Sequence, residues 1–153
     1  GLLRPSFIAD RAQRELQELV RYRRSLVAER AREANRIQKV LEGANVKLAA
    51  VVSNVLGVSG RAMLSALASG TTEPHELAAL ATARLTASPE QLAAALEGQV
   101  GPHQRHLLAA QLRHIAFLDG EVARLDAEIE ARLRPFDDAL LRTPSNGSIP
   151  FPA

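Results

Sequence analysis

Two long stretches of heptad-spaced apolar residues restrict what this sequence can fold into. Between Pro102 and Pro135 the steps are 4, 3, 3, 4, 3, 4 and 4, through Leu108, Leu112, Ile115, Leu118, Val122, Leu125, Ile129 and Leu133. Such spacing places one apolar stripe along an α-helix, and Pro102 suits the first turn of that helix. We call these eight residues the seam. They are the candidate association surface of the chain.

A second long helix is predicted near the start. Residues 10–42 hold neither Gly nor Pro, Asp10 is suited to cap the helix, and Gly43 with Asn45 is suited to end it. Apolar residues recur at heptad-like steps in Leu16, Leu19, Val20, Leu26, Val27, Ala34, Ile37 and Leu41. The two helices can pair with each other as an antiparallel coiled-coil-like hairpin or with a second copy, and the spacing does not choose.

The middle of the chain favours short Ala-rich helices. We predict them near Val46–Leu56, after Ser59, from Thr72–Pro74 and from Ser88, which opens a Ser-Pro-Glu-Gln capping box. The segment Gly57–Arg61 is predicted to be a turn between helices. No strand pattern is visible, so the predicted fold class is all-α.

The predicted organisation has five parts. They are an extended segment at 1–9, a long basic amphipathic helix at 10–42, a short-helix insert at 43–101, a heptad helix with its continuation at 102–141, and a disordered tail at 142–153. Pro135 is expected to break the last helix, because proline lacks the backbone N–H that a helix interior uses.

Charge is unevenly distributed along the chain. Up to Lys47 there are eleven Lys/Arg against six Asp/Glu, a net +5, whereas the remainder has eight against eleven, a net −3. A basic arm on a mildly acidic body is typical of a segment that binds a polyanion. An arginine-rich face that is simply solvated would give the same composition.

The cations of the first helix form one stripe. At 100° per residue, Arg14, Arg21, Arg32, Arg36 and Lys39 fall within about 40° of the direction of Arg14, while the apolar residues fall near the opposite side. These five are the candidate nucleic-acid-binding residues, because the helix could be packed and still present cations to phosphates. Arg23 and Arg30 lie on the apolar side, where we expect them to snorkel or to pair.

Composition and spacing argue against an active site. The chain has no cysteine, which excludes disulfides, thiolate metal sites and cysteine nucleophiles, and aromatic residues make up only 3%. His103 and His106 lack an acidic third ligand, and His114 is too far away to join them, so no metal site is predicted. We expect no cofactor and no small-molecule substrate. No run of residues is apolar enough to predict a membrane span.

Carboxylates along the last helix are expected to be solvating charges on its outer face. They are Asp119, Glu121, Asp126, Glu128 and Glu130. Arg124 and Glu128 are predicted to form an i,i+4 pair.

Long ordered blocks of the chain resemble a known family. The blocks are GLLRPSFI, RELQELVRYRRSLVAERAREANRIQKVLEGANVKLAAVVSNVLGVSGRAML, GPHQRHLL, HIAFLD and LDAEIEARLRPF. They resemble the middle of transposases of the insertion sequence 110 family (the 116/902 group), over about residues 1–141.

The resemblance implies a place in a larger enzyme. In that family a RuvC-like domain with four acidic metal ligands comes first, a helical coiled-coil segment follows, and a C-terminal domain carries a serine nucleophile. The enzymes use a structured bridge RNA to choose the DNA sites that they recombine. This chain matches the helical middle, and after Leu141 it departs into RTPSNGSIPFPA. The departure suggests a truncation or frameshift, so the nucleophile's role is not carried over to Ser145 or Ser148.

Two functions follow as hypotheses. The first is a non-catalytic coiled-coil fragment of a DNA transposase, an oligomer in the bacterial cytoplasm at the nucleoid, which contacts DNA or structured RNA and other subunits. The second is a free-standing helical self-association module without nucleic-acid binding. An independent small enzyme has almost no support, because no polar cluster converges.

Overall fold

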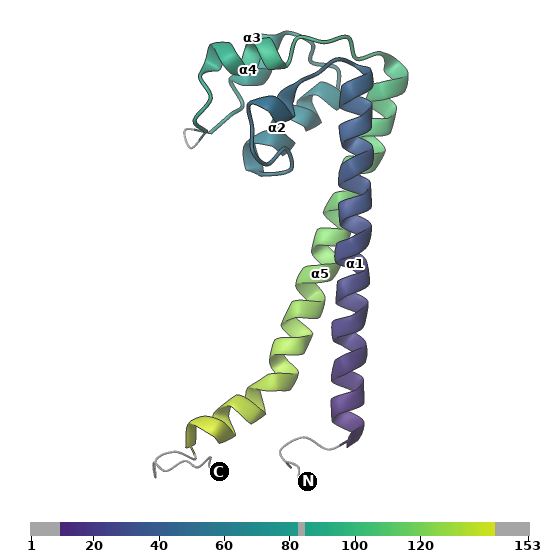
Figure 1. Cartoon of the computed structure of the whole chain (residues 1–153), viewed down its shortest axis with the longest axis vertical. Coiled ribbons are helices and arrows are strands. Elements are labelled where there is room, and N and C mark those ends of the chain that lie inside the picture. The colour runs from purple at the N-terminus through teal and green to yellow at the C-terminus, as the bar shows by residue number, and fades with distance from the viewer. Residues whose placement is uncertain (1–9, 83–84, 143–153) are drawn as a thin grey trace. The chain divides into compact units, whose positions relative to one another are not determined.

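The computed structural model describes residues 10–82 and 85–142, with the backbone alone from 137 onward. These residues form helices and no strand, which confirms the all-α fold class. The elements are α1 (Asp10–Gly43), a 3-10 turn η1 (Leu48–Ala50), α2 (Val58–Ala68), α3 (Pro74–Ala78), α4 (Pro89–Ala95) and α5 (Pro102–Arg142). Figure 1 shows the two long helices, α1 and α5, and the short ones between them in the chain.

The chain divides into two compact units. The first contains α1 up to Ala28 and α5 from Leu118 onward, and the second contains Glu29–Phe117. Each long helix therefore contributes one part to each unit.

In the first unit the parts of α1 and α5 run antiparallel. Two side-chain contacts fix this direction, since Glu15 meets Arg132 and Arg23 meets Asp126. Of the two pairings that the spacing leaves open, the structure has the antiparallel one within a single chain.

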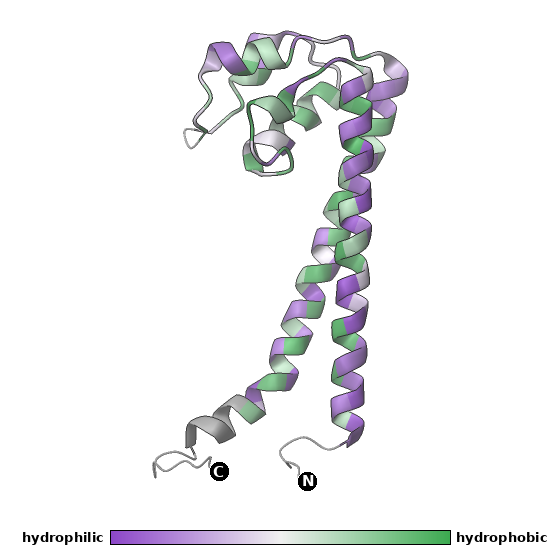
Figure 2. Cartoon of the chain, in the orientation of Figure 1, coloured by the Kyte–Doolittle hydropathy of each residue, from purple (hydrophilic) through white to green (hydrophobic). Residues whose placement is uncertain are grey.

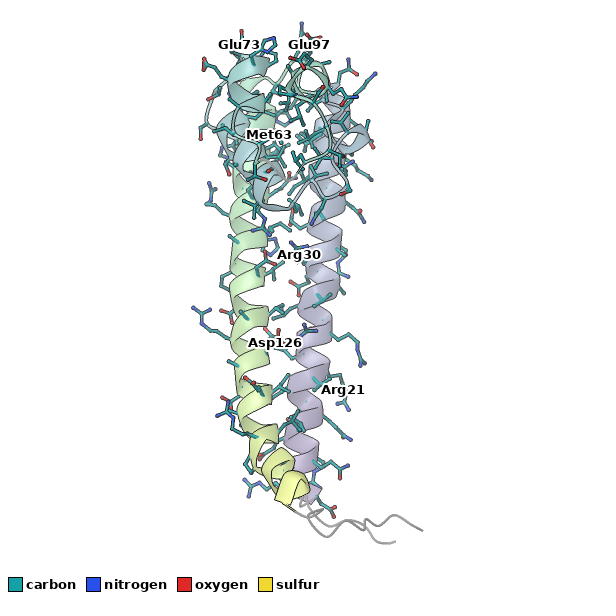
Figure 3. The ribbon with its side chains drawn as sticks, turned by 90° about the vertical axis from the view of Figure 1, so that its left-hand side faces the viewer. Arg21, Arg30, Met63, Glu73, Glu97 and Asp126 are labelled. Atoms are coloured by element: carbon teal, nitrogen blue, oxygen red, sulfur yellow. The ribbon has the colours of Figure 1, made fainter. Side chains whose placement is uncertain are left out.

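The second unit holds the main hydrophobic core. The insert helices α2, α3 and α4 pack onto the parts of α1 and α5 that belong to this unit, and Met63 lies in the middle of the insert (Figure 3). The largest fully buried side chains of this core are Ile37, Leu41, Leu48, Met63, Leu64, Leu77, Leu108 and Ile115. Small residues fill the remaining space, which lets short helices approach closely.

The end of α1 explains why the first predicted insert helix is wrong. Asn45 has a positive φ of 59°, the Val46 N–H donates to the Leu41 carbonyl and the Asn45 N–H donates to the Glu42 carbonyl. This is a Schellman motif with Asn45, not Gly43, as the left-handed residue. The helix predicted near Val46–Leu56 is reduced to η1, because the chain turns here and the Lys47 N–H donates to the Ala95 carbonyl beside α4.

The start of α2 differs from the predicted turn. Gly57 is the N-cap, and Val58, Ser59, Gly60 and Arg61 already belong to the first turn of α2. Gly60 is buried, and a Cβ atom there would lie 1.9 Å from the Val55 carbonyl oxygen. Glycine is thus required for the close approach of two backbone segments.

The other predicted helix starts agree with the structure. Glu73 caps α3, with Pro74 at its first position. The Ser88 hydroxyl accepts from the Gln91 N–H, and the Gln91 side chain accepts from the Ser88 N–H, which is the predicted capping box of α4.

The helix break predicted at Pro135, near the C-terminal end of α5, is wrong. The helix continues through Pro135 to Arg142. Proline removes one N–H from the helix, and the neighbouring turns continue without it. The predicted extended segment 1–9 lies outside the described residues, as does the predicted tail apart from Arg142, which ends α5.

Candidate nucleic-acid interface on the first long helix

All five predicted nucleic-acid-binding residues are exposed. Arg14 and Arg21 lie on the part of α1 that belongs to the first unit. Arg32, Arg36 and Lys39 lie on the part that belongs to the second unit. In Figure 3, Arg21 points away from α5. Polar residues cover much of α1 outside its contact with α5 (Figure 2).

Four of these five cations have no ion-pair partner among the described residues. They are Arg14, Arg21, Arg32 and Lys39. Arg36 is different, because its guanidinium donates to Glu33 at 3.0 Å. An exposed cation without a partner keeps its full charge available for an external anion, and arginine can bind a phosphate with two donors.

The side of α1 opposite these cations packs against the rest of the chain. Leu26, Ile37 and Leu41 are buried there. Two residues of the predicted apolar stripe lie outside this contact, since Val20 is 37% and Val27 is 42% exposed. The basic side chains are thus presented by a helix whose other face is fixed.

The seam of α5 faces its own chain in both units. Leu108, Ile115 and Leu118 are buried, and the other five seam residues are half-buried. In the second unit Leu108 and Ile115 belong to the same core as Ile37 and Leu41 of α1. The seam therefore serves the intramolecular hairpin, and its use between copies stays a prediction.

A buried acid, Glu33, occupies a heptad position of α1 that sequence reasoning missed. Glu33 is buried, with its side chain 8% exposed, and its Oε1 accepts from the Nδ1 of His114 at 2.7 Å. The missed signal is a spacing of seven. Leu19, Leu26 and Glu33 form one such series, and Leu16, Arg23, Arg30 and Ile37 form the next.

Arg23 pairs as predicted. Its guanidinium donates to both oxygens of Asp126. This hydrogen bond, and then the charge of Asp126, raise the pKa of Arg23 above its ordinary value. The pKa of Arg132 is likewise raised, first by its hydrogen bond to Glu128, with a smaller contribution from Glu15. Both arginines therefore stay charged at any ordinary pH.

Two predictions about the carboxylates of α5 need correction. Asp126 is not only a solvating charge, because it holds Arg23 of α1. Arg124 pairs with Glu121, and Glu128 pairs with Arg132 at 2.8 Å, so the predicted Arg124–Glu128 pair is wrong. Both choices are allowed on a helix, since i,i+3 and i,i+4 neighbours share a face.

The described residues hold an apolar groove and no metal-ligating cluster. Within 10–82 and 85–142, no three His, Cys, Asp or Glu side chains lie close enough to hold a metal ion. One groove of about 550 Å³ lies in the second unit, and the only ionisable side chain among its lining residues is His75. Its other lining residues are Ala78, Ala79, Ala81, Thr82, Leu85, Ala87, Pro89 and Leu92.

A bilayer-spanning helix is not found in the part of the chain that the structure describes.

The start of the chain is similar to a known family. Residues 1–46 match the model of a transposase family, the DEDD transposases of insertion sequence 110. The matched stretch includes all of α1 and therefore all five exposed cations. No curated protein matches the chain significantly, and no solved structure does so either.

Proposed function

We propose that this chain is the non-catalytic central segment of a DNA transposase. In this proposal α1 contacts DNA or structured RNA, and the helix pair supports association between subunits. The observation that carries it is a set of exposed cations, Arg14, Arg21, Arg32 and Lys39, which have no ion-pair partner among the described residues. They lie on a helix within the match to the transposase family. Such a segment would act at the bacterial nucleoid.

The proposed contact is electrostatic. Each cation that neutralises a phosphate releases a condensed counterion, so binding weakens as salt is raised. Phosphate contacts of this kind position a protein on a nucleic acid without reading its sequence. The segment would need neither a metal nor a cofactor for this role, and catalysis would belong to other parts of the transposase.

A salt titration of binding tests the proposal. Fluorescence anisotropy would follow the full chain on labelled duplex DNA and on a labelled RNA hairpin between about 50 and 200 mM salt. The variant Arg14→Gln/Arg21→Gln/Arg32→Gln/Lys39→Gln removes the four unpaired cations. If all four contact phosphates, the slope of log K against log salt should shrink by about 3 to 4 on duplex DNA.

A matched control removes four other exposed cations. Lys47, Arg113, Arg124 and Arg134 are exposed and lie outside α1, so their exchange for glutamine changes the net charge equally. Arg124 and Arg134 hold ion pairs with Glu121 and Glu130, so the control is matched in charge and exposure and not in pairing. The control should keep most of the affinity and slope. Parental binding by the α1 variant would reject the nucleic-acid role and leave the free-standing self-association module as the better description.

A further inference from the structure

One exposed aromatic side chain of α1 lies beside the basic residues of the first unit. Tyr22 is 57% exposed, and its ring and hydroxyl have no hydrogen bond or ring contact with the described residues. The Ser25 hydroxyl donates to the backbone carbonyl of Tyr22 at 2.7 Å and leaves the tyrosine side chain free. The Tyr22 ring is therefore available to a partner from outside the chain.

The surface around Tyr22 is cationic and polar. Four exposed charged residues between 14 and 24 have no ion-pair partner among the described residues: Arg14, Glu18, Arg21 and Arg24. One turn from Tyr22 on either side, Glu18 and Ser25 are exposed. The apolar residues at that distance are turned inward, since Leu19 is half-buried and Leu26 is buried. Contiguous apolar patches mark protein interfaces, and α1 forms no such patch at Tyr22.

A groove lies on the other side of Arg21. At 100° per residue, Tyr22 lies about 100° to one side of Arg21, and Arg24 lies about 60° to the other. The groove has a volume of about 340 Å³ and is lined by Leu16, Gln17, Val20, Arg21 and Arg24. In Figure 3, Arg21 points away from α5, so its guanidinium is open to an anion. An aromatic ring, a cation and a groove with an apolar floor thus follow one another around α1.

These features match an unpaired nucleotide. Every base has a π-face that stacks on an aromatic ring, and the phosphates of a single strand follow a cationic surface. Inside a duplex the faces of each base are covered by its neighbours, so a duplex offers α1 its phosphates alone. We propose that Tyr22 stacks on an unpaired base while Arg21 and Arg24 bind the phosphates that flank it. This inference rests on the proposed function and deepens it, since it names single-stranded segments as the preferred class of ligand.

Tyrosine emission gives a direct test, because Tyr22 is the one tyrosine of the sequence and tryptophan is absent. A short single strand of DNA or RNA should quench this emission in the full chain, since a stacked base quenches tyrosine. An abasic strand of the same length carries the same phosphates. At equal occupancy, measured by anisotropy, it should leave the emission unchanged. Equal quenching by both strands would overturn the inference, whereas quenching by DNA alone or RNA alone would identify which of the two is the ligand.

Variants separate stacking from charge. Tyr22→Ala should lower the affinity for the single strand about five- to hundredfold, because one stacked base is lost. Its affinity for duplex DNA should change less than about twofold, which also shows that the variant is folded. Tyr22→Phe keeps an aromatic ring and should bind both forms like the parent. Phe117→Ala is the matched control, since Phe117 is 61% exposed and lies in the second unit.

The two proposals fail in different ways. If Tyr22→Ala binds single strands like the parent, or loses single strand and duplex equally, the stacking inference is overturned. An equal loss in Phe117→Ala would overturn it as well. In each of these cases the contact of α1 with phosphates stands, because the four-cation variant tests it through the salt slope on duplex DNA. A parent chain that binds neither form of nucleic acid would overturn both proposals.

Discussion

Glu33 of α1 and His114 of α5 form a polar contact in the second unit. The Glu33 Oε1 lies 2.7 Å from the His114 Nδ1, and the Glu33 side chain is 8% exposed whereas that of His114 is 42% exposed. A carboxylate can only accept, so the Nδ1 of His114 must carry the proton. Arg36 donates to the same Glu33 oxygen. The buried carboxylate is therefore satisfied from both helices.

Removing His114 should leave Glu33 poorly satisfied. We expect His114→Ala to lower the free energy of unfolding by about 1–3 kcal/mol, because a buried acceptor loses a hydrogen bond. His106→Ala is the matched control, since His106 is exposed on the same helix, and its effect should stay within about 0.5 kcal/mol. Urea unfolding followed by circular dichroism measures both. Equal stability of the two variants would contradict the role of the contact.

Replacing both partners should behave differently. In Glu33→Leu/His114→Leu the interface becomes apolar at this position, and a buried polar pair is often exchanged for apolar residues at little cost. We expect this double variant to be more stable than His114→Ala. A double variant that is less stable than either single change would show that the pair stabilises more than its desolvation costs.

Two glycines should respond to alanine with opposite signs. At Gly120 in α5 the nearest atom to an added Cβ is 3.8 Å away, so Gly120→Ala should raise stability by about 0.5–1 kcal/mol through a better helix propensity. At Gly60 the added Cβ would collide with the Val55 carbonyl oxygen, so Gly60→Ala should cost about 1–3 kcal/mol. Thermal unfolding compares the two. A stabilising Gly60→Ala would show that the approach of Val55 is looser than described.

The seam of α5 could be predicted because apolar residues fill nearly all of its inward positions. The facing side of α1 could not be predicted fully, since Glu33 takes an inward position while Val20 and Val27 are exposed. A prediction that uses only apolar residues places the centre of the α1 stripe too close to Val20 and Val27. The helical wheel places Arg23 on the inward side, but its partner Asp126 is identified only once the antiparallel register of α1 and α5 is known.

Local signals differed in how well they predicted the insert. The start of α4 follows from four consecutive residues, because a capping box is satisfied within its own turn. The segment after α1 depends on distant partners, since the Lys47 N–H donates to the Ala95 carbonyl and the Gln99 N–H donates to the Ala44 carbonyl. Those contacts outweigh the local preference for a helix near Val46–Leu56.

The capping box of α4 gives a further prediction. Ser88→Ala should lower stability by about 1 kcal/mol, because the Gln91 N–H loses its acceptor. Ser88→Asp should keep most of the stability, since aspartate is an equally good N-cap. Thr86→Ala is a nearby exposed control. Urea unfolding of the three variants should rank Ser88→Ala lowest, and a control with the same loss would mean that the cap is not responsible.

The Arg23–Asp126 pair predicts a charge exchange within the hairpin. Arg23→Asp or Asp126→Arg alone should lower the melting temperature, because each sets like charges opposite one another across the two helices. The double exchange should recover most of the loss, and added salt should reduce the effect of each single change. A double variant as unstable as the singles would mean that the two side chains do not face each other in solution.

The same pair has a defined pH dependence. The hydrogen bond to Asp126, and then the charge of Asp126, raise the pKa of Arg23 above its ordinary value. A raised pKa contributes stability that is fully present below the unfolded value and is lost only as pH rises through the folded one. Between about pH 6 and 9, at fixed ionic strength, the stabilisation from the Arg23 charge should therefore stay constant. Melting curves of wild type and Arg23→Gln at several pH values measure it as their difference. A difference that shrinks as pH rises through this window would show that the arginine charge is not what stabilises the contact.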